Sequence, residues 1–242
     1  MEWSDVARIL AVRPHGETSA IVDILTPSQG RHAGLVRGGR SKSQRPVLQA
    51  GNRVHVTWRA RLADQLGNFQ IEPDHLSAGA LMEDPLALSG LNAACALSVL
   101  SLPEREVHRA VYDAFEVLIE TLNDPDIWPA LYVRWEAGLL SDLGYGLDLK
   151  RCAVTGVEDD LSHVSPRTGR AVCSHEAEPY RDKLLALPGF LKGLGDVNEG
   201  DIGAGLALTG HFLERRVLWP TDRVLPEARH LMQDRLERAG RL

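Results

Sequence analysis

The chain has 242 residues, a formal charge of −6 and three cysteines. Its length allows a substantial core in one large domain or two smaller ones. The first five residues, MEWSD, lack the basic start and apolar run of a secretory signal, and three cysteines without such a signal argue against a disulfide framework. The longest charge-free apolar segment, residues 86–102, is shorter than the roughly 20 apolar residues of a membrane span. We therefore expect a cytoplasmic protein with no membrane partner.

Alternating residues and turn formers predict strands at 6–12, 18–25, 31–36, 53–62 and 68–72. The clearest alternation is in 53–62, where Trp58 falls on the apolar face and is expected in the core. Five short strands with almost no helical pattern favour a small closed barrel such as an OB-fold, with an SH3-like barrel as the alternative.

Charge is distributed unevenly along the chain. Residues 1–80 carry 10 Lys and Arg against 7 Asp and Glu, a net +3, whereas residues 81–242 carry 17 against 26, a net −9. Residues 24–63 contain eight cations and no acidic residue. A block of one sign attracts polyanions, although it can also be an ordinary solvated surface. The candidate DNA-binding residues are Arg31, Arg37, Arg40, Lys42, Arg45, Arg53, Arg59 and Arg61.

After residue 84 the period changes and predicts helices at 86–100, 103–122, 127–143, 182–186, 199–217 and 226–239. The fold class is therefore α+β. We expect an N-terminal barrel in residues 1–80 and an all-α domain in residues 81–242, interrupted by a turn-rich insertion at 147–180.

The insertion resembles a small metal-stapled knuckle. A closed zinc site needs four ligands, usually from two CxxC pairs, but Cys152 is followed three residues later by Thr155, and Cys173 by Glu176. The candidate metal ligands are thus an incomplete set, Cys152, Cys173 and His175, with His163 or Glu176 as further options. Ordinary packing without a metal is the favoured alternative, so we expect no cofactor.

Motifs of catalysis are missing from the sequence. We find no GxSxG, no HExxH and no GxGxxG after a strand. We expect a protein that is not an enzyme.

Several motifs together resemble the bacterial RecO family of recombination mediators. In the N-terminal part they are residues 13–19 (RPHGETS), Asp23, Gly30-Arg31 and residues 38–42 (GGRSK). Further along they are residues 143–146 (LGYG) with Cys152, and residues 164–170 (VSPRTGR). The resemblance covers nearly the whole chain in the family's order.

The resemblance implies an OB domain, a helical domain with a zinc knuckle, and a nucleoid-associated role in the RecF pathway of recombinational repair. It implies binding of single- and double-stranded DNA, annealing of complementary strands, work with RecR, contact with the acidic tail of single-strand binding protein, and indirect help in loading RecA. It places Arg134 and Arg229 at the contact with that tail. The family's zinc-binding members carry four cysteines, two of which are replaced here by Thr155 and Glu176.

Two other readings of the residues stay open. One is a protein-interaction scaffold whose basic barrel binds an acidic peptide rather than DNA. The other is a metal-dependent nucleic-acid enzyme built on the two knuckle cysteines and His175.

Overall fold

The computed structural model describes residues 1–193 and 196–242 and forms two compact units. The first unit contains Met1–Pro125 and Pro226–Arg229, and the second contains Asp126–Leu225 and His230–Leu242. Strands give way to helices close to the predicted boundary at residue 80, but the first unit keeps the next two long helices with its barrel.

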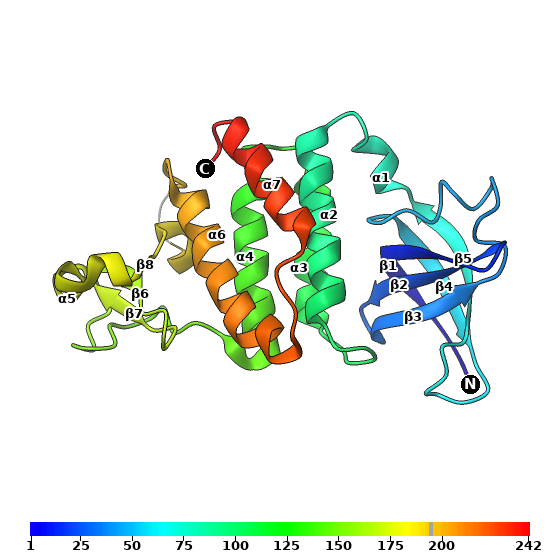
Figure 1. Cartoon of the computed structure of the whole chain (residues 1–242), viewed down its shortest axis with the longest axis horizontal. Helices are drawn as coiled ribbons and strands as arrows, with labels where there is room; N and C mark the ends of the chain where they lie inside the picture. The colour runs from blue at the N-terminus through cyan, green and yellow to red at the C-terminus, as the bar shows by residue number, and fades with distance from the viewer. Residues whose placement is uncertain (194–195) are drawn as a thin grey trace. The chain divides into compact units, whose positions relative to one another are not determined.

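The barrel of the first unit has five strands: β1 (Glu2–His15), β2 (Ser19–Thr26), β3 (Gly30–Val36), β4 (Arg53–Arg59) and β5 (Asn68–His75). Figure 1 shows them wrapped around one another in blue and cyan. Their closed order is β1-β2-β3-β5-β4, with antiparallel neighbours except where β3 runs parallel to β5 and Leu35 lies opposite Asn68. This is an OB-fold, so the predicted fold class is confirmed and the SH3-like alternative is not.

The barrel interior follows the predicted alternation along β4. Val54, Val56 and Trp58 are buried, while the residues between them reach the surface or lie half-buried. The Trp58 ring stacks on Trp3 with 5.8 Å between ring centroids, and its Nε1 donates to the Leu66 carbonyl at 3.0 Å. Trp58 is therefore a core residue, as predicted.

Three helices complete the first unit: α1 (Ser77–Ala80), α2 (Pro85–Ser101) and α3 (Arg109–Thr121). Helix α2, predicted at 86–100, begins where the Asp84 side chain accepts hydrogen bonds from the amides of Leu86 and Ala87. It packs against β1, as Figure 1 shows.

The predicted start of α3 at residue 103 is wrong. Arg105 adopts a left-handed conformation, with φ of 64°, and its amide donates to the Arg31 carbonyl at 2.7 Å. Residues 103–108 therefore run beside β3, and the helix begins only at Arg109.

The second unit is built on two long helices, α4 (Trp128–Leu140) and α6 (Asp201–Phe212). They pack closely because Gly205 has no side chain: a Cβ there would lie 2.7 Å from Val133. The Thr209 hydroxyl also donates to the buried Glu136 carboxylate at 2.5 Å. Helix α7 (Glu227–Arg238) has residues in both units.

The segment predicted as an insertion at 147–180, together with the residues that follow it up to 186, forms a three-stranded sheet in the order β7-β6-β8. Its elements are β6 (Leu161–Val164), β7 (Ala171–Cys173), α5 (Ser174–Ala177), the short helical turn η2 (Glu178–Lys183) and β8 (Leu185–Ala186). The predicted helix at 182–186 is wrong, because Leu185 pairs with Val164 and gives its backbone to the sheet. The remaining short turns are η1 (Ser141–Tyr145), η3 (Gly189–Lys192), η4 (Leu213–Leu218) and η5 (Trp219–Thr221).

Among the described residues no helix combines the length and the apolar character that crossing a membrane requires.

Candidate nucleic-acid interface

Four of the predicted cations lie on the loop that joins β3 to β4. Arg37, Arg40, Lys42 and Arg45 are all exposed, and none of them forms an ion pair with a carboxylate in the described parts of the chain. We call residues 37–45 the cationic loop. Its four charges therefore face water without compensation, which is the arrangement that attracts phosphate.

Backbone hydrogen bonds fix the shape of the cationic loop. Gly38 takes a positive φ of 67°, which a residue with a side chain rarely adopts, and the Arg40 amide donates to the Thr18 carbonyl at 3.0 Å. At the other end, the side-chain amide of the buried Asn52 donates to the backbone carbonyls of Pro46 and Val47. The loop is thus anchored at both ends while its charged side chains stay in water.

Two open grooves of the first unit include side chains of the cationic loop. One has a volume of about 310 Å³ and is lined by Val12, Pro14, Ala20, Gly39, Arg40, Arg45 and Leu48. The other has a volume of about 480 Å³ and is lined by Val36, Arg37, Gln44, Arg59, Asn68, Phe69, Gln70 and Ile71. Each groove combines an apolar floor with two guanidinium groups.

Three other candidate cations, Arg31, Arg53 and Arg59, are paired with carboxylates, unlike the cations of the cationic loop. Arg31 is 13% exposed and its guanidinium lies 3.0 Å from the buried Asp23 carboxylate. Arg53 donates to Asp74 at 2.6 Å, and Arg59 to Glu2 at 2.8 Å. These carboxylates hold the pKa of Arg53 and of Arg59 above its ordinary value, chiefly through the hydrogen bonds that they accept.

Arg61 is exposed and forms no ion pair with the described residues. It does not lie on β4 beside Arg53 and Arg59, because that strand ends at Arg59 rather than at the predicted residue 62. Arg61 lies in the loop between β4 and β5, which Arg105 holds through hydrogen bonds to the carbonyls of Ala63 and Gln65.

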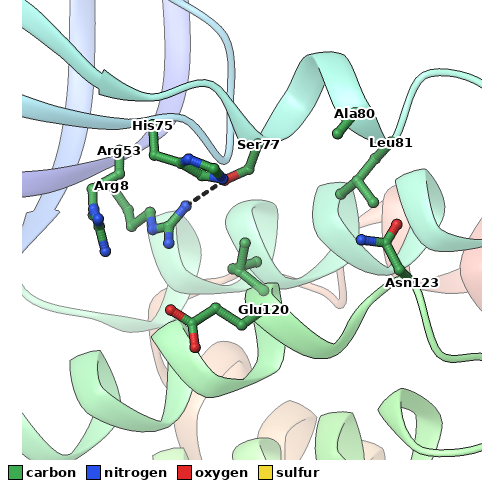
Figure 2. Close-up of a pocket in the computed structure, with 9 residues that line it drawn as sticks. Arg8, Arg53, His75, Ser77, Ala80, Leu81, Glu120 and Asn123 are labelled. Atoms are coloured by element: carbon green, nitrogen blue, oxygen red, sulfur yellow. Dashed lines mark hydrogen bonds between the residues drawn. The ribbon is translucent and has the colours of Figure 1, made fainter.

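A buried arginine that the sequence prediction missed lines another pocket of the first unit, of about 240 Å³ (Figure 2). The dashed line in Figure 2 marks the 2.8 Å hydrogen bond from Arg8 to the Ser77 hydroxyl. Two further bonds join Arg8 to both carboxylate oxygens of Glu116, at 2.6 and 2.9 Å. Because Glu116 neutralises Arg8, and Asp74 and Glu116 lie beside Arg53, this pocket does not present free positive charge. Its only signal in sequence is a charged residue inside an apolar strand.

The two predicted partner contacts are placed differently. Arg134 on α4 is exposed, donates to the Phe190 carbonyl at 2.8 Å, and lies 5.9 Å from the centroid of the Phe190 ring. Arg229 is only 2% exposed, because helix α7 places it on the same buried stripe as Met232 and Leu236. As placed here, Arg229 does not offer its guanidinium to a partner.

Cys152 and Cys173 lie close together in the knuckle, but within the described residues His175 does not form a metal-binding group with them. The Cys173 amide donates to the Cys152 sulfur at 3.4 Å, and the Thr155 hydroxyl lies 3.8 Å from the Cys173 sulfur. Burial opposes ionisation of the Cys152 thiol, but hydrogen bonds from the Thr155 hydroxyl and nearby amides outweigh it and lower the thiol's pKa to about 6. His175 is exposed, and the described residues contain no group of three or more His, Cys, Asp and Glu side chains that could hold a metal. This donor set does not fit a closed four-ligand zinc site.

Comparison with known proteins identifies the family. A family model described as recombination protein O N terminal matches residues 1–73, and one described as recombination protein O C terminal matches residues 82–223. The chain belongs to the RecO family. This confirms the resemblance, and RecO membership assigns the chain a role in DNA repair and recombination.

Individual RecO proteins match over most or all of their length. The DNA repair protein RecO of Phenylobacterium zucineum is 56% identical over 243 residues, and that of Caulobacter sp. strain K31 is 53% identical, each with all of both chains covered. The DNA repair protein RecO of Agrobacterium fabrum is 52% identical over 91% of this chain and 87% of its own.

Proposed function

We propose that this chain is a non-enzymatic, DNA-binding recombination mediator that holds single- and double-stranded DNA on its cationic loop. The observation that carries the proposal is the contrast in pairing. Arg37, Arg40, Lys42 and Arg45 have no carboxylate partner among residues 1–193 and 196–242, whereas the arginines of the strands do. Cations on a loop of an OB-fold can follow a phosphate backbone without reading sequence.

Charge neutralisation explains how such a protein anneals complementary strands. Two strands repel each other through their phosphates, and bound Lys and Arg replace the counterions that would otherwise screen them. Residues 81–242, with their net charge of −9, stay away from DNA and remain available for proteins. The proposed partners are RecR, the acidic tail of single-strand binding protein with Arg134 among its contacts, and RecA indirectly through its loading.

The direct test changes Arg37, Arg40 and Lys42 together to Ala. Each lost phosphate contact lowers the log–log salt slope by about 0.7 on a single strand, so we expect a loss of affinity and a slope reduced by up to about two. The matched control removes three exposed cations of the second unit, which form no ion pair with its described residues, with the substitutions Lys150→Ala, Arg167→Ala and Lys183→Ala. The control should leave both quantities near those of the wild type.

Annealing in the presence of single-strand binding protein is the second readout. The loop variant should anneal complementary oligonucleotides more slowly than the control variant does. Unchanged affinity, salt slope and annealing in the loop variant would contradict the proposal. Binding of an acidic, apolar-ended peptide without binding of DNA would instead support the scaffold reading.

For the knuckle we propose that packing and hydrogen bonds, not zinc, hold its fold. The support is the donor set, two thiols and a threonine hydroxyl, with His175 exposed. Metal analysis of the purified protein should find less than one zinc per chain, and a chelator should leave its unfolding midpoint unchanged. Stoichiometric zinc would overturn this proposal.

A further inference from the structure

The groove of about 480 Å³ beside the cationic loop contains two carboxamides, one partly buried and one exposed, that form no hydrogen bond with the described residues. Gln44 comes from the loop, and its Oε1 is buried without a hydrogen-bond partner in the part of the chain that the structure describes. Asn68 comes from the start of β5, and its exposed side chain makes no hydrogen bond within the described residues. A buried amide oxygen without a partner is costly in a folded protein, which suggests that a ligand or water supplies the missing donor.

The chemistry around these amides fits a nucleotide. A carboxamide offers one acceptor and two donors, the combination that pairs with the edge of a nucleobase. Arg37, which forms no ion pair within the described residues, lines the same groove and can contact the adjoining phosphate. The groove volume also falls within the range of about 300–1,000 Å³ that is usual for small-ligand sites.

The floor of the groove determines how a base would enter. Val36 and Ile71 are buried and apolar, and Phe69 is only 5% exposed because its ring packs against Trp3 and His32. The face of the Phe69 ring is therefore not available for stacking. A base can enter edge first, with its rim on the apolar floor and its polar groups toward the amides.

We infer that this groove binds one unpaired nucleobase of a DNA strand, whose hydrogen-bonding edge meets Gln44 and Asn68 while Arg37 contacts the adjoining phosphate. The inference rests on the proposed function and adds to it a contact that distinguishes single strands from duplex. In a duplex the Watson–Crick edge is already paired and cannot meet the amides, whereas an unpaired base can be recognised on that edge.

The test removes the amides but keeps the size of the side chains, with Gln44→Met and Asn68→Leu combined. Two lost hydrogen bonds predict a roughly 10-fold weaker binding of a single-stranded oligonucleotide. The salt slope should not change, because no phosphate contact is lost, and duplex binding should not change either. Gln49→Met is the matched control, since Gln49 lies on the same connection but does not line the groove.

An oligonucleotide with abasic sites tests the inference on the wild-type protein, without requiring that the amide variant fold. The wild-type protein should bind the abasic strand more weakly than the normal strand, and the amide variant should bind the abasic strand as the wild type does. Equal binding of normal and abasic strands by the wild type would overturn the inference, even if the variant failed to fold. So would unchanged single-strand affinity in a folded variant.

The two proposals fail in different ways. If the Arg37, Arg40 and Lys42 variant loses DNA binding while the amide variant does not, only the base site is wrong. If neither variant loses binding, the cationic loop is the wrong surface and both proposals are wrong. The amide variant could also lose duplex binding as much as single-strand binding. This result would overturn the base site, because the contact would then not depend on the Watson–Crick edge of an unpaired base.

Discussion

The strands of the barrel and the cationic loop carry the same kind of residue in opposite electrostatic settings. On the strands, Arg8 is paired with Glu116, Arg31 with Asp23 and Arg59 with Glu2. On the loop, none of the cations has such a partner among the described residues. An arginine with a carboxylate fixed beside it stabilises the fold, whereas an arginine without one remains available to an external anion. Pairing with a carboxylate, more than position in a basic stretch of sequence, therefore separates structural from ligand-binding cations.

The strand arginines also differ among themselves. Arg8 is 1% exposed and makes a bidentate contact, while Arg59 and Glu2 are both well exposed. An exposed pair contributes about 0–1 kcal/mol, but removing one partner of a buried pair costs about 3–5 kcal/mol. The effect of a substitution should therefore follow burial.

The largest effect is expected for Arg8→Met. The change leaves the Glu116 carboxylate, the Ser77 hydroxyl and the Gly51 carbonyl without their donor, and we expect a loss of about 3–5 kcal/mol in the free energy of unfolding. Urea unfolding measures this loss, and Arg109→Ala, which breaks an exposed pair with Asp113, should change the free energy of unfolding much less. An equal loss of unfolding free energy in the two variants would show that burial does not determine how much an ion pair stabilises the fold.

Asp23→Asn should have the next largest effect. Asp23 is buried and accepts hydrogen bonds from Arg13 at 2.8 Å and Arg31 at 3.0 Å, and an amide cannot satisfy both guanidinium groups. We expect a loss of about 1.5–3 kcal/mol in urea unfolding, as for hydrogen bonds to charged groups. DNA affinity should not fall, because the loop cations are unchanged. A fall in affinity without a change in stability would place Asp23 in the interface rather than in the fold.

Local patterns of sequence predicted the barrel well because burial alternates along its strands. The alternation at residues 53–59 placed Val54, Val56 and Trp58 in the core, and the change of period after residue 84 placed the start of α2 within one residue. The count of short strands favoured the OB-fold, the helical period predicted the α-helical part, and the resemblance to the RecO family implied the same two parts.

The ion pairs could not be predicted, because they depend on strand register. Glu2 lies opposite Arg59 only because β1 and β4 pair in that register, and residue 104 reaches Arg31 only because the chain runs beside β3 before α3 begins. The burial of Arg229 was missed for a related reason. Its spacing to Met232 and Leu236 marks a helical stripe, but sequence alone does not tell that the stripe is buried.

His32 differs from the strand arginines, because it is a titratable group whose ring forms no hydrogen bond or ion pair with the described residues. It is 4% exposed, and both ring nitrogens lack a hydrogen-bond partner among the described residues. Burial between Trp3 and Trp58, with a smaller effect of the charge on Arg105, lowers the pKa of His32 to about 4. The neutral ring is therefore the form that the folded barrel accommodates.

Protonation of His32 should destabilise the fold in acid. In the unfolded chain its pKa is about 6.5, so between pH 6.5 and about 4 the unfolded state binds one proton more than the folded state. Stability should fall by up to about 1.4 kcal/mol for each pH unit in this window and level off below it. His32→Phe should flatten this part of the profile measured by urea unfolding, and His15→Phe, at an exposed site, should not. The same pH slope in wild type and His32→Phe would show that His32 is not the group responsible.

The smallest effect on stability is expected for Arg45→Ala on the cationic loop. Arg45 is exposed and has no ion pair with the described residues, so its removal should change the free energy of unfolding by no more than about 0.5 kcal/mol. On the proposed DNA surface the same change should weaken single-strand binding and reduce the log–log salt slope by about 0.7. Arg59→Ala is the matched comparison, because Arg59 is exposed but already paired with Glu2. Its removal should reduce the salt slope less, since Glu2 already neutralises it. If the two substitutions reduced the slope equally, pairing within the barrel would not determine which arginines meet phosphate, and the contrast between loop and strands would lose its functional meaning.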